Sequence, residues 1–179
     1  YNTPLETDAD IYNNTDELCV NCAGAVSIDY GFTTKSQRAD YYILYIVDGH
    51  MDIELNGTKM CISAGQLVII KPGTKYSYHG AAGQNVQYLW IHFSGKAANE
   101  TVLKFNLTFN NIMNIGIRQR LFESWQHMFY EFLNNDKFFK ESSCCILNEI
   151  LIMFSRYLND DGKSNRLFKA LFYIHEHFN

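Results

Sequence analysis

The stretch from residue 87 to 95, QYLWIHFSG, places rings that carry polar atoms at every second position. Side chains of a β-strand alternate between its two faces, so Tyr88, Trp90 and His92 should share one face. The indole offers an apolar platform to the C–H face of a sugar, while phenols and polar neighbours can bond its hydroxyls. The alternative is that these rings only fill a core, with their polar atoms bonded to the backbone.

The cysteines do not form a recognisable metal or redox motif. Cys19 and Cys22 make a C-x-x-C, but no second pair of Cys or His at short spacing completes a zinc site. The surrounding LCVNCAGAVSIDYGF reads as extended, whereas a thioredoxin-like motif would open a helix. We therefore expect reduced thiols, as in a cytoplasmic protein.

Nucleophilic catalysis lacks a motif as well. The chain has neither a G-x-S-x-G nor a Gly-rich phosphate loop before a helix. Ser94 and His92 would share a strand face, but no third group is placed to orient them. The sequence therefore predicts a protein that is not an enzyme.

Composition limits the remaining classes. With 179 residues, 47% hydrophobic and 15% aromatic, the chain can form one domain with a well-filled core. The net charge of −4 argues against a broad basic surface for nucleic acid or anionic membrane. No apolar run approaches the roughly 20 residues that span a bilayer, and the acidic N-terminus is unlike a signal peptide.

Two kinds of periodicity divide the chain. From residue 18 to 95 short β-rich runs alternate with tight turns such as Asn56-Gly57 and Pro72-Gly73, a pattern typical of a sandwich or small barrel. After Gly95 apolar residues recur at steps of three and four, which predicts helices over 117–134 and 140–158. Leu133 falls on the apolar stripe of the first of these helices.

The second helix carries more apolar surface than one contact requires, because Ile146, Met153 and Tyr157 widen its stripe. A helix that is apolar nearly all round must be covered on two sides. We expect the second cover to be the same helix of another subunit, with contact residues Ile146, Ile150, Met153 and Tyr157. The alternative is a wholly internal helix in a monomer.

RADYYILYIVDGHMDIELNGTKMCISAGQLVIIKPGTKYSY, followed by QYLWIHFSG, resembles the sensor domain of AraC-type transcription regulators. The family pattern has an Arg before a D-Y-x-L-x-Y-V strand and a Gly, then G-x-x-x-x-x-x-P with an aromatic residue or His after it, then W-x-x-F-x-G. The match covers about residues 18 to 95. It implies an α+β fold, a cupin-like (jelly-roll) β-barrel followed by two to three α-helices.

The resemblance also implies an organisation. Residues 1–17 would be an N-terminal arm, 18–98 the effector-binding barrel, and 99–160 a helical dimerisation region. Residues 161–179 would be a linker and first helix, since LFKALFYIHEHFN is similar to the helix that precedes the first helix-turn-helix of that family. The DNA-binding domain that this helix would lead into is expected to lie beyond the sequence, and DNA to be bound only through it. The effector is expected to be a sugar.

In sugar-sensing members the effector lies inside the barrel, against a tryptophan and under an arginine. The resemblance therefore implies Trp90 as the stacking platform and Arg38 as the bonding cation. Tyr78 and Tyr88 would be neighbours that bond hydroxyls. Arg38 has an alternative role as a surface residue paired with Asp40, which would contribute little.

Two weaker candidates and one departure complete the predicted site. His92 is included because it shares the face of Trp90, and Asn21 because it is a polar residue of the first strand. Many family members have His where Tyr76 stands, so the choice of ligand does not carry over.

The barrel also resembles the cupins, whose metal-binding members hold an ion with an H-x-H pair and a Glu on one strand and a His on a later one. Here Tyr45 and Val47 stand where the paired imidazoles are expected, and Tyr76 where the later His is. We therefore expect neither metal nor cofactor. The competing functions are a cupin-type sugar isomerase or other cupin enzyme, and a barrel without ligand that serves only for dimerisation.

Overall fold

The computed structural model describes residues 15–159, and all structural statements concern this part of the chain. Its first strands are β1 (Cys19–Ile28), β2 (Phe32–Gln37), β3 (Tyr41–Asp48), β4 (His50–Leu55) and β5 (Thr58–Ser63). They are followed by β6 (Gln66–Ile70), β7 (Lys75–Gly80) and β8 (Val86–Ser94). The chain continues with α1 (Ala98–Lys104), β9 (Met113–Asn114), α2 (Gln119–Asn134) and α3 (Phe139–Leu158).

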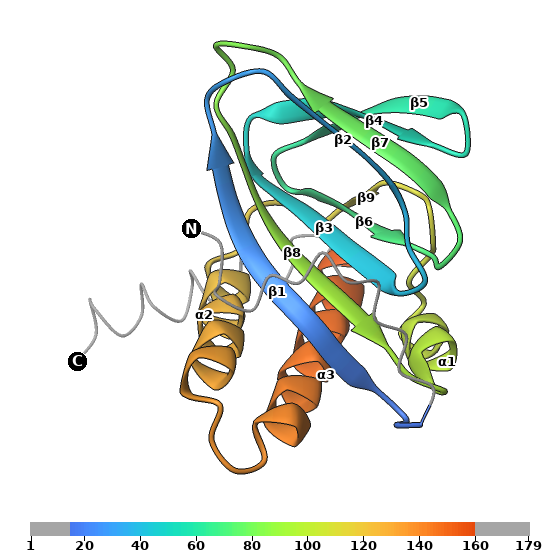
Figure 1. Cartoon of the computed structure of the whole chain (residues 1–179), viewed down its shortest axis with the longest axis vertical. Helices are drawn as coiled ribbons and strands as arrows, with labels where there is room; N and C mark the ends of the chain where they lie inside the picture. The colour runs from blue at the N-terminus through green and yellow to red at the C-terminus, as the bar shows by residue number, and fades with distance from the viewer. Residues whose placement is uncertain (1–14, 160–179) are drawn as a thin grey trace, which may run out of the picture.

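The strands form two antiparallel sheets that face each other. Sheet A has the order β1-β8-β3-β6-β9 and sheet B the order β2-β7-β4-β5. Figure 1 shows the long strands β1, β8 and β3 of sheet A side by side, with sheet B beyond them. The predicted α+β class, a cupin-like jelly roll followed by helices, is confirmed.

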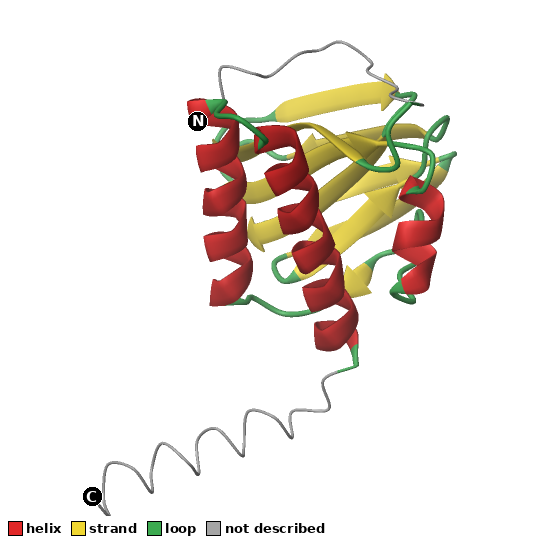
Figure 2. Cartoon of the chain, turned by 90° about the horizontal axis from the view of Figure 1, so that it is seen from below, coloured by secondary structure: helices red, strands yellow, loops and turns green. Residues whose placement is uncertain are grey.

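In the described part of the chain, residues 15–159, the two long helices cover one of the two sheets. Figure 2 shows the two long helices along one side of the strands and the short helix α1 at one end. α2 and α3 pack on the outer face of sheet A, where a core of buried apolar residues extends from the strands to both helices. A second core lies between the two sheets.

The strand β8 contributes to both cores, as its alternation predicts. Tyr88 and Trp90 belong to the core between the sheets. Leu89, Ile91 and Phe93 belong to the core under the helices. The face of β8 that carries Tyr88 and Trp90 therefore points into the space between the two sheets.

The predicted hairpin at Asn56-Gly57 is present between β4 and β5. Both residues have positive φ, 49° and 88°, as a type I′ turn requires. Asn56 also receives a hydrogen bond on its side-chain oxygen from the backbone N–H of Lys75 (3.0 Å), which ties the hairpin to the start of β7.

Both predicted long helices exist, but the stripe of α2 is narrower than the sequence suggests. Leu121, Trp125 and Met128 are buried against sheet A and α3. Leu133, predicted to lie on the same stripe, is 57% exposed. It is the last residue but one of α2, which ends at Asn134 and is followed by the C-cap Asn135 with a left-handed backbone (φ 51°).

The predicted contact residues on α3 do not form one exposed surface. Ile150 and Met153 are 0% and 2% exposed within a single chain, so they belong to the subunit's own core. Ile146 and Tyr157 are half-buried, and the Arg118 guanidinium lies over the Tyr157 ring at 4.6 Å. Within one chain, Ile146 and Tyr157 are therefore the partly exposed members of the four predicted contact residues, and the contact between subunits stays a prediction.

Some predictions fall outside the described residues: most of the N-terminal arm, residues 1–14, and the linker and last helix, residues 161–179. Among the helices in the described range, none is long and apolar enough to cross a membrane.

Candidate ligand-binding site

A cavity of about 270 Å³ opens between the two sheets. It is lined from sheet A by β1, β3 and β8, from sheet B by β2 and β7, and by the turn before β3. Five predicted ligand residues line it: Arg38, Tyr78, Tyr88, Trp90 and His92. The sixth, Asn21, lies behind this wall and reaches it through Asp40.

Aromatic rings in contact cover much of the cavity wall on sheet A. The His92 ring stacks on Tyr42, with centroids 4.3 Å apart and planes 2° from parallel. Trp90 meets His92 edge-on at 5.4 Å. These three side chains come from the neighbouring strands β3 and β8, so strand pairing fixes their spacing.

Tyrosines continue the wall onto sheet B. Tyr42 contacts Tyr76 across the cavity, with centroids 5.6 Å apart. Tyr76 and Tyr78 lie parallel on β7 at 6.2 Å, and Tyr78 meets Tyr88 of β8 edge-on at 6.1 Å. The cavity is therefore enclosed by rings whose hydroxyl groups come from both sheets.

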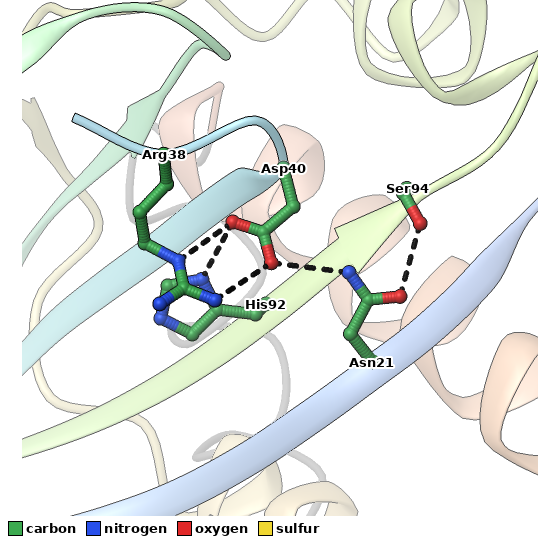
Figure 3. Close-up of polar contacts among 5 residues, drawn as sticks. All are labelled: Asn21, Arg38, Asp40, His92 and Ser94. Atoms are coloured by element: carbon green, nitrogen blue, oxygen red, sulfur yellow. Dashed lines mark hydrogen bonds and ion pairs between the residues drawn. The ribbon is translucent and has the colours of Figure 1, made fainter. Parts of the chain in front are cut away.

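A buried carboxylate, Asp40, organises the polar side of the cavity (Figure 3). Arg38 donates to it twice, from Nε to Oδ1 (2.8 Å) and from Nη2 to Oδ2 (3.2 Å). His92 Nδ1 lies 3.1 Å from Oδ1, and Asn21 Nδ2 donates to Oδ2 at 3.1 Å. Ser94 in turn donates to the Asn21 oxygen at 2.9 Å. We call these five residues the Asp40 cluster.

Asp40 is a site residue that the sequence did not predict, since it was expected only as a surface partner for Arg38. The pair does form, but it is not on the surface: the Asp40 side chain is 0% and that of Arg38 14% exposed. The available signal was the R-x-D pattern directly before an apolar β-rich run, because opposite charges two positions apart can pair and a paired charge can be buried. Asn21, the weakest prediction, acts as a bonding partner of Asp40.

Electrostatics keep Asp40 ionised. Burial alone would raise the pKa of its carboxyl, but the hydrogen bonds from His92, Arg38 and Asn21 outweigh burial and hold the pKa below its ordinary value. Burial also opposes the charge of Arg38, and the bond to Asp40 outweighs it, so the pKa of the guanidinium is raised. The buried pair is therefore charged on both sides.

Two tyrosines of the cavity, Tyr42 and Tyr76, are held as neutral phenols by burial. Burial raises the pKa of Tyr76 to about 12, and burial with neighbouring tyrosines raises that of Tyr42 well above its ordinary value. A neutral phenol can both donate and accept a hydrogen bond. The cavity thus offers two-way hydrogen bonding over apolar ring faces.

The lowered pKa of Asp40 predicts a loss of stability in acid. In the unfolded chain the carboxyl titrates near 3.8, and in the folded protein below that value. Its contribution to the free energy of unfolding is therefore complete above the unfolded pKa and disappears as pH falls through the folded pKa. In urea unfolding at a series of pH values, the stability gap between wild type and Asp40→Asn should shrink on acidification. A gap that stays constant would contradict this.

Tyr45 and Val47, expected at the metal-ligand positions of a cupin, do not lie inside the barrel. Tyr45 and Val47 face the helices, not the barrel, and the Tyr45 hydroxyl donates to Gly116 O at 2.9 Å. Leu44 and Ile46 are the β3 residues beside Tyr42 that face inward. Within residues 15–159 no group of three or more His, Cys, Asp or Glu side chains is arranged to hold a metal ion.

A larger hollow of about 550 Å³ lies on the outside of sheet B. Its side chains, among them Asp52, Glu54, Lys59 and His79, all come from β4, β5 and β7 of one sheet. Of these two hollows, the smaller cavity is the one where side chains converge from both sheets, and the buried ion pair of Arg38 and Asp40 lies there as well. We therefore take the smaller cavity as the candidate site.

A family model described as AraC-like ligand binding domain matches residues 22–140. No curated protein matches the chain. Among solved structures, the cupin domain of Schizosaccharomyces pombe Cnp3 is similar at 17% identity and a TM-score of 0.38, over 47% of this chain and 57% of that one. The Clostridium difficile EutQ protein is similar at 22% and 0.34, over 40% and 54%. KdgF from Halomonas sp. is similar at 23% and 0.36, over 45% and 72%. The chain thus spans little more than half of the first two.

Proposed function

We propose, from the premise that this chain belongs to the family of AraC-like ligand binding domains, that its cavity between the sheets binds a small carbohydrate. The observation that carries the proposal is the meeting of aromatic rings and a buried ion pair in that cavity. Ring faces accept the C–H face of a sugar, and the phenols and Asp40 cluster supply bonds to hydroxyl groups.

Charge and size support a neutral ligand with one sugar ring. Arg38 and Asp40 neutralise each other at 2.8 Å, so the bonded pair adds no net charge to the cavity. The volume of about 270 Å³ is near the lower end of the roughly 300–1,000 Å³ usual for small-molecule sites. A monosaccharide suits this space better than an oligosaccharide does.

Reversible binding without turnover is part of the proposal. Both oxygens of Asp40 already accept two hydrogen bonds each, which suits a structural acceptor better than a general base. The competing function is a cupin-type enzyme such as a sugar isomerase. Conversion of a bound sugar by the purified protein would favour that competitor.

We further propose that the chain is the sensing part of a transcription regulator. Ligand binding would favour one arrangement of barrel and helices over another, and so change how attached DNA-binding domains are presented. The contact that supports such coupling is Trp125 of α2, whose Nε1 donates to the backbone oxygen of Trp90 at 3.5 Å. The residue that lines the cavity is thus bonded to the helical layer.

A homodimer stays part of the proposal, with a revised contact. Ile146 and Tyr157 are half-buried on α3 and are available to a second subunit, whereas Ile150 and Met153 are not. In the family that this chain resembles, subunits commonly pair through these helices. Light scattering should then give a mass near twice 20.8 kDa. A protein that stays monomeric with and without ligand would contradict it.

The binding site is tested by replacing Trp90. After a thermal-shift screen of monosaccharides has found a ligand, calorimetry on Trp90→Ala should show binding weaker by about 1–3 kcal/mol, because the platform is lost. Arg38→Gln tests the polar side of the cavity separately. Tyr130→Ala is the matched control, since Tyr130 is an aromatic residue 62% exposed on α2. A folded Trp90→Ala variant with unchanged affinity would rule out this cavity as the site.

A further inference from the structure

Gly24 stands in the middle of β1, directly opposite Trp90 of β8. A glycine inside a strand weakens it, because it adds backbone freedom and no packing. Its backbone does not need glycine here, since Gly24 is not among the glycines with positive φ. The reason for a glycine at this position must be space.

The indole of Trp90 occupies that space. A Cβ atom on Gly24 would overlap the Trp90 atoms Cε2, Cζ2 and Nε1, well inside van der Waals contact. The ring therefore lies across the glycine, against the strand next to its own, and remains only 6% exposed. With any larger residue at position 24 the ring would have to leave this seat.

Sheet B repeats the arrangement. Phe32 of β2 is paired with Gly80 of β7, and a Cβ on Gly80 would overlap the Phe32 ring. Phe32 then meets Tyr78, a residue of the cavity wall, edge-on at 6.1 Å. Each sheet thus seats one ring on a glycine of the neighbouring strand.

We propose that Gly24 is the positioning residue for the ligand platform: it seats the Trp90 indole against β1 and so sets the free space of the cavity. The proposal rests on the proposed function, since the space matters only if a ligand fills it. A side chain at position 24 displaces the indole toward the cavity, where His92 already meets its edge at 5.4 Å. Ligand size is therefore determined partly by a residue that offers the ligand no side chain.

The position of the Trp90 indole is tested first without ligand, by tryptophan fluorescence of the full chain. The chain has two tryptophans, so a Trp125→Phe background leaves Trp90 as the one fluorescent reporter. Gly24→Ala should change the emission maximum of Trp90 and its quenching by acrylamide, and lower the Tm by on the order of 5 °C. Gly31→Ala is the control without a clash, since its Cβ would meet its nearest atom at an ordinary 3.4 Å. Gly80→Ala is the control with a clash at a different ring, and should leave the Trp90 signal unchanged.

A double-mutant cycle decides whether the indole itself is the obstacle. The Tm loss caused by Gly24→Ala should vanish when Trp90 is replaced by leucine. An unchanged Trp90 signal in Gly24→Ala, or an equal Tm loss with and without the indole, would overturn the proposal.

Ligand binding then separates the two proposals. For any of D-glucose, D-galactose or D-xylose that binds wild type, Gly24→Ala should weaken binding by on the order of tenfold, and most for the largest sugar. Equal affinities would overturn the link between the seat and ligand size. If the indole moves as expected but no sugar binds wild type, the carbohydrate proposal fails while the positioning role of Gly24 stands.

Discussion

Replacing Asp40 by asparagine is expected to lower the free energy of unfolding by about 3–5 kcal/mol, the cost of removing one partner of a buried ion pair. Both carboxylate oxygens accept two bonds, from Arg38 and His92 on one side and from Arg38 and Asn21 on the other. In either orientation of the asparagine amide, its NH₂ group takes the place of an oxygen that accepted two hydrogen bonds. It then faces two donors to which it cannot bond. Arg38 also loses the negative charge that compensates it.

Urea unfolding of the variant, followed by far-UV circular dichroism, gives the measurement. Asp48→Asn is the matched control, because Asp48 ends β3, the strand that begins directly after Asp40, but is exposed and accepts a hydrogen bond from Asn85. It should unfold close to wild type. If Asp40→Asn did so too, the cluster would contribute little and the buried pair could not be what holds this wall of the cavity.

The second large effect concerns the helical layer. Met153→Glu places a charge at a site that is 2% exposed, beneath α3, and should also cost about 3–5 kcal/mol of unfolding free energy. Met153→Leu keeps volume and polarity and should cost less than about 1.5 kcal/mol. Thermal unfolding of the two variants under the same conditions compares the effect of a buried charge, in Met153→Glu, with that of a changed side-chain shape, in Met153→Leu.

Ile146→Glu distinguishes the core from a contact between subunits. Ile146 is half-buried on the same helix, so its variant should stay folded, and its mass in light scattering should drop if subunits pair there. A Met153→Glu variant that is folded and monomeric would instead restore Met153 to the subunit contact. It would show that the helix has an uncovered side at that position.

The faces of β8 could be predicted from its own residues, because a period of two needs no information from the rest of the chain. The same rule fails for β3, which is apolar on both faces, so that no polar residue indicates which side is which. Tyr45 was therefore assigned to the barrel, although it faces the helices. An apolar run reveals burial on both sides but not its own orientation.

The polar half of the site could be predicted only in part. Asn21 lies 19 positions and His92 52 positions from Asp40 in the sequence. The pairing of β1, β8 and β3 brings both to this one carboxylate. The role of Gly24 could not be predicted from the sequence for a similar reason. Its role depends on the residue opposite it, which is defined by strand register and not by neighbours in sequence.

The alternation of β8 has a consequence for how this domain can change over generations. The large apolar side chains of the strand divide between the two cores, with Tyr88 and Trp90 on the cavity side and Leu89, Ile91 and Phe93 on the side of the helices. Under the proposed function, point substitutions at Tyr88, Trp90 or His92 should therefore alter which ligand is bound while the helices keep their packing. Insertion of a single residue would exchange the two faces and disrupt both cores at once. We therefore expect the ligand specificity of this domain to change through substitutions in β8 and not through insertions or deletions in it.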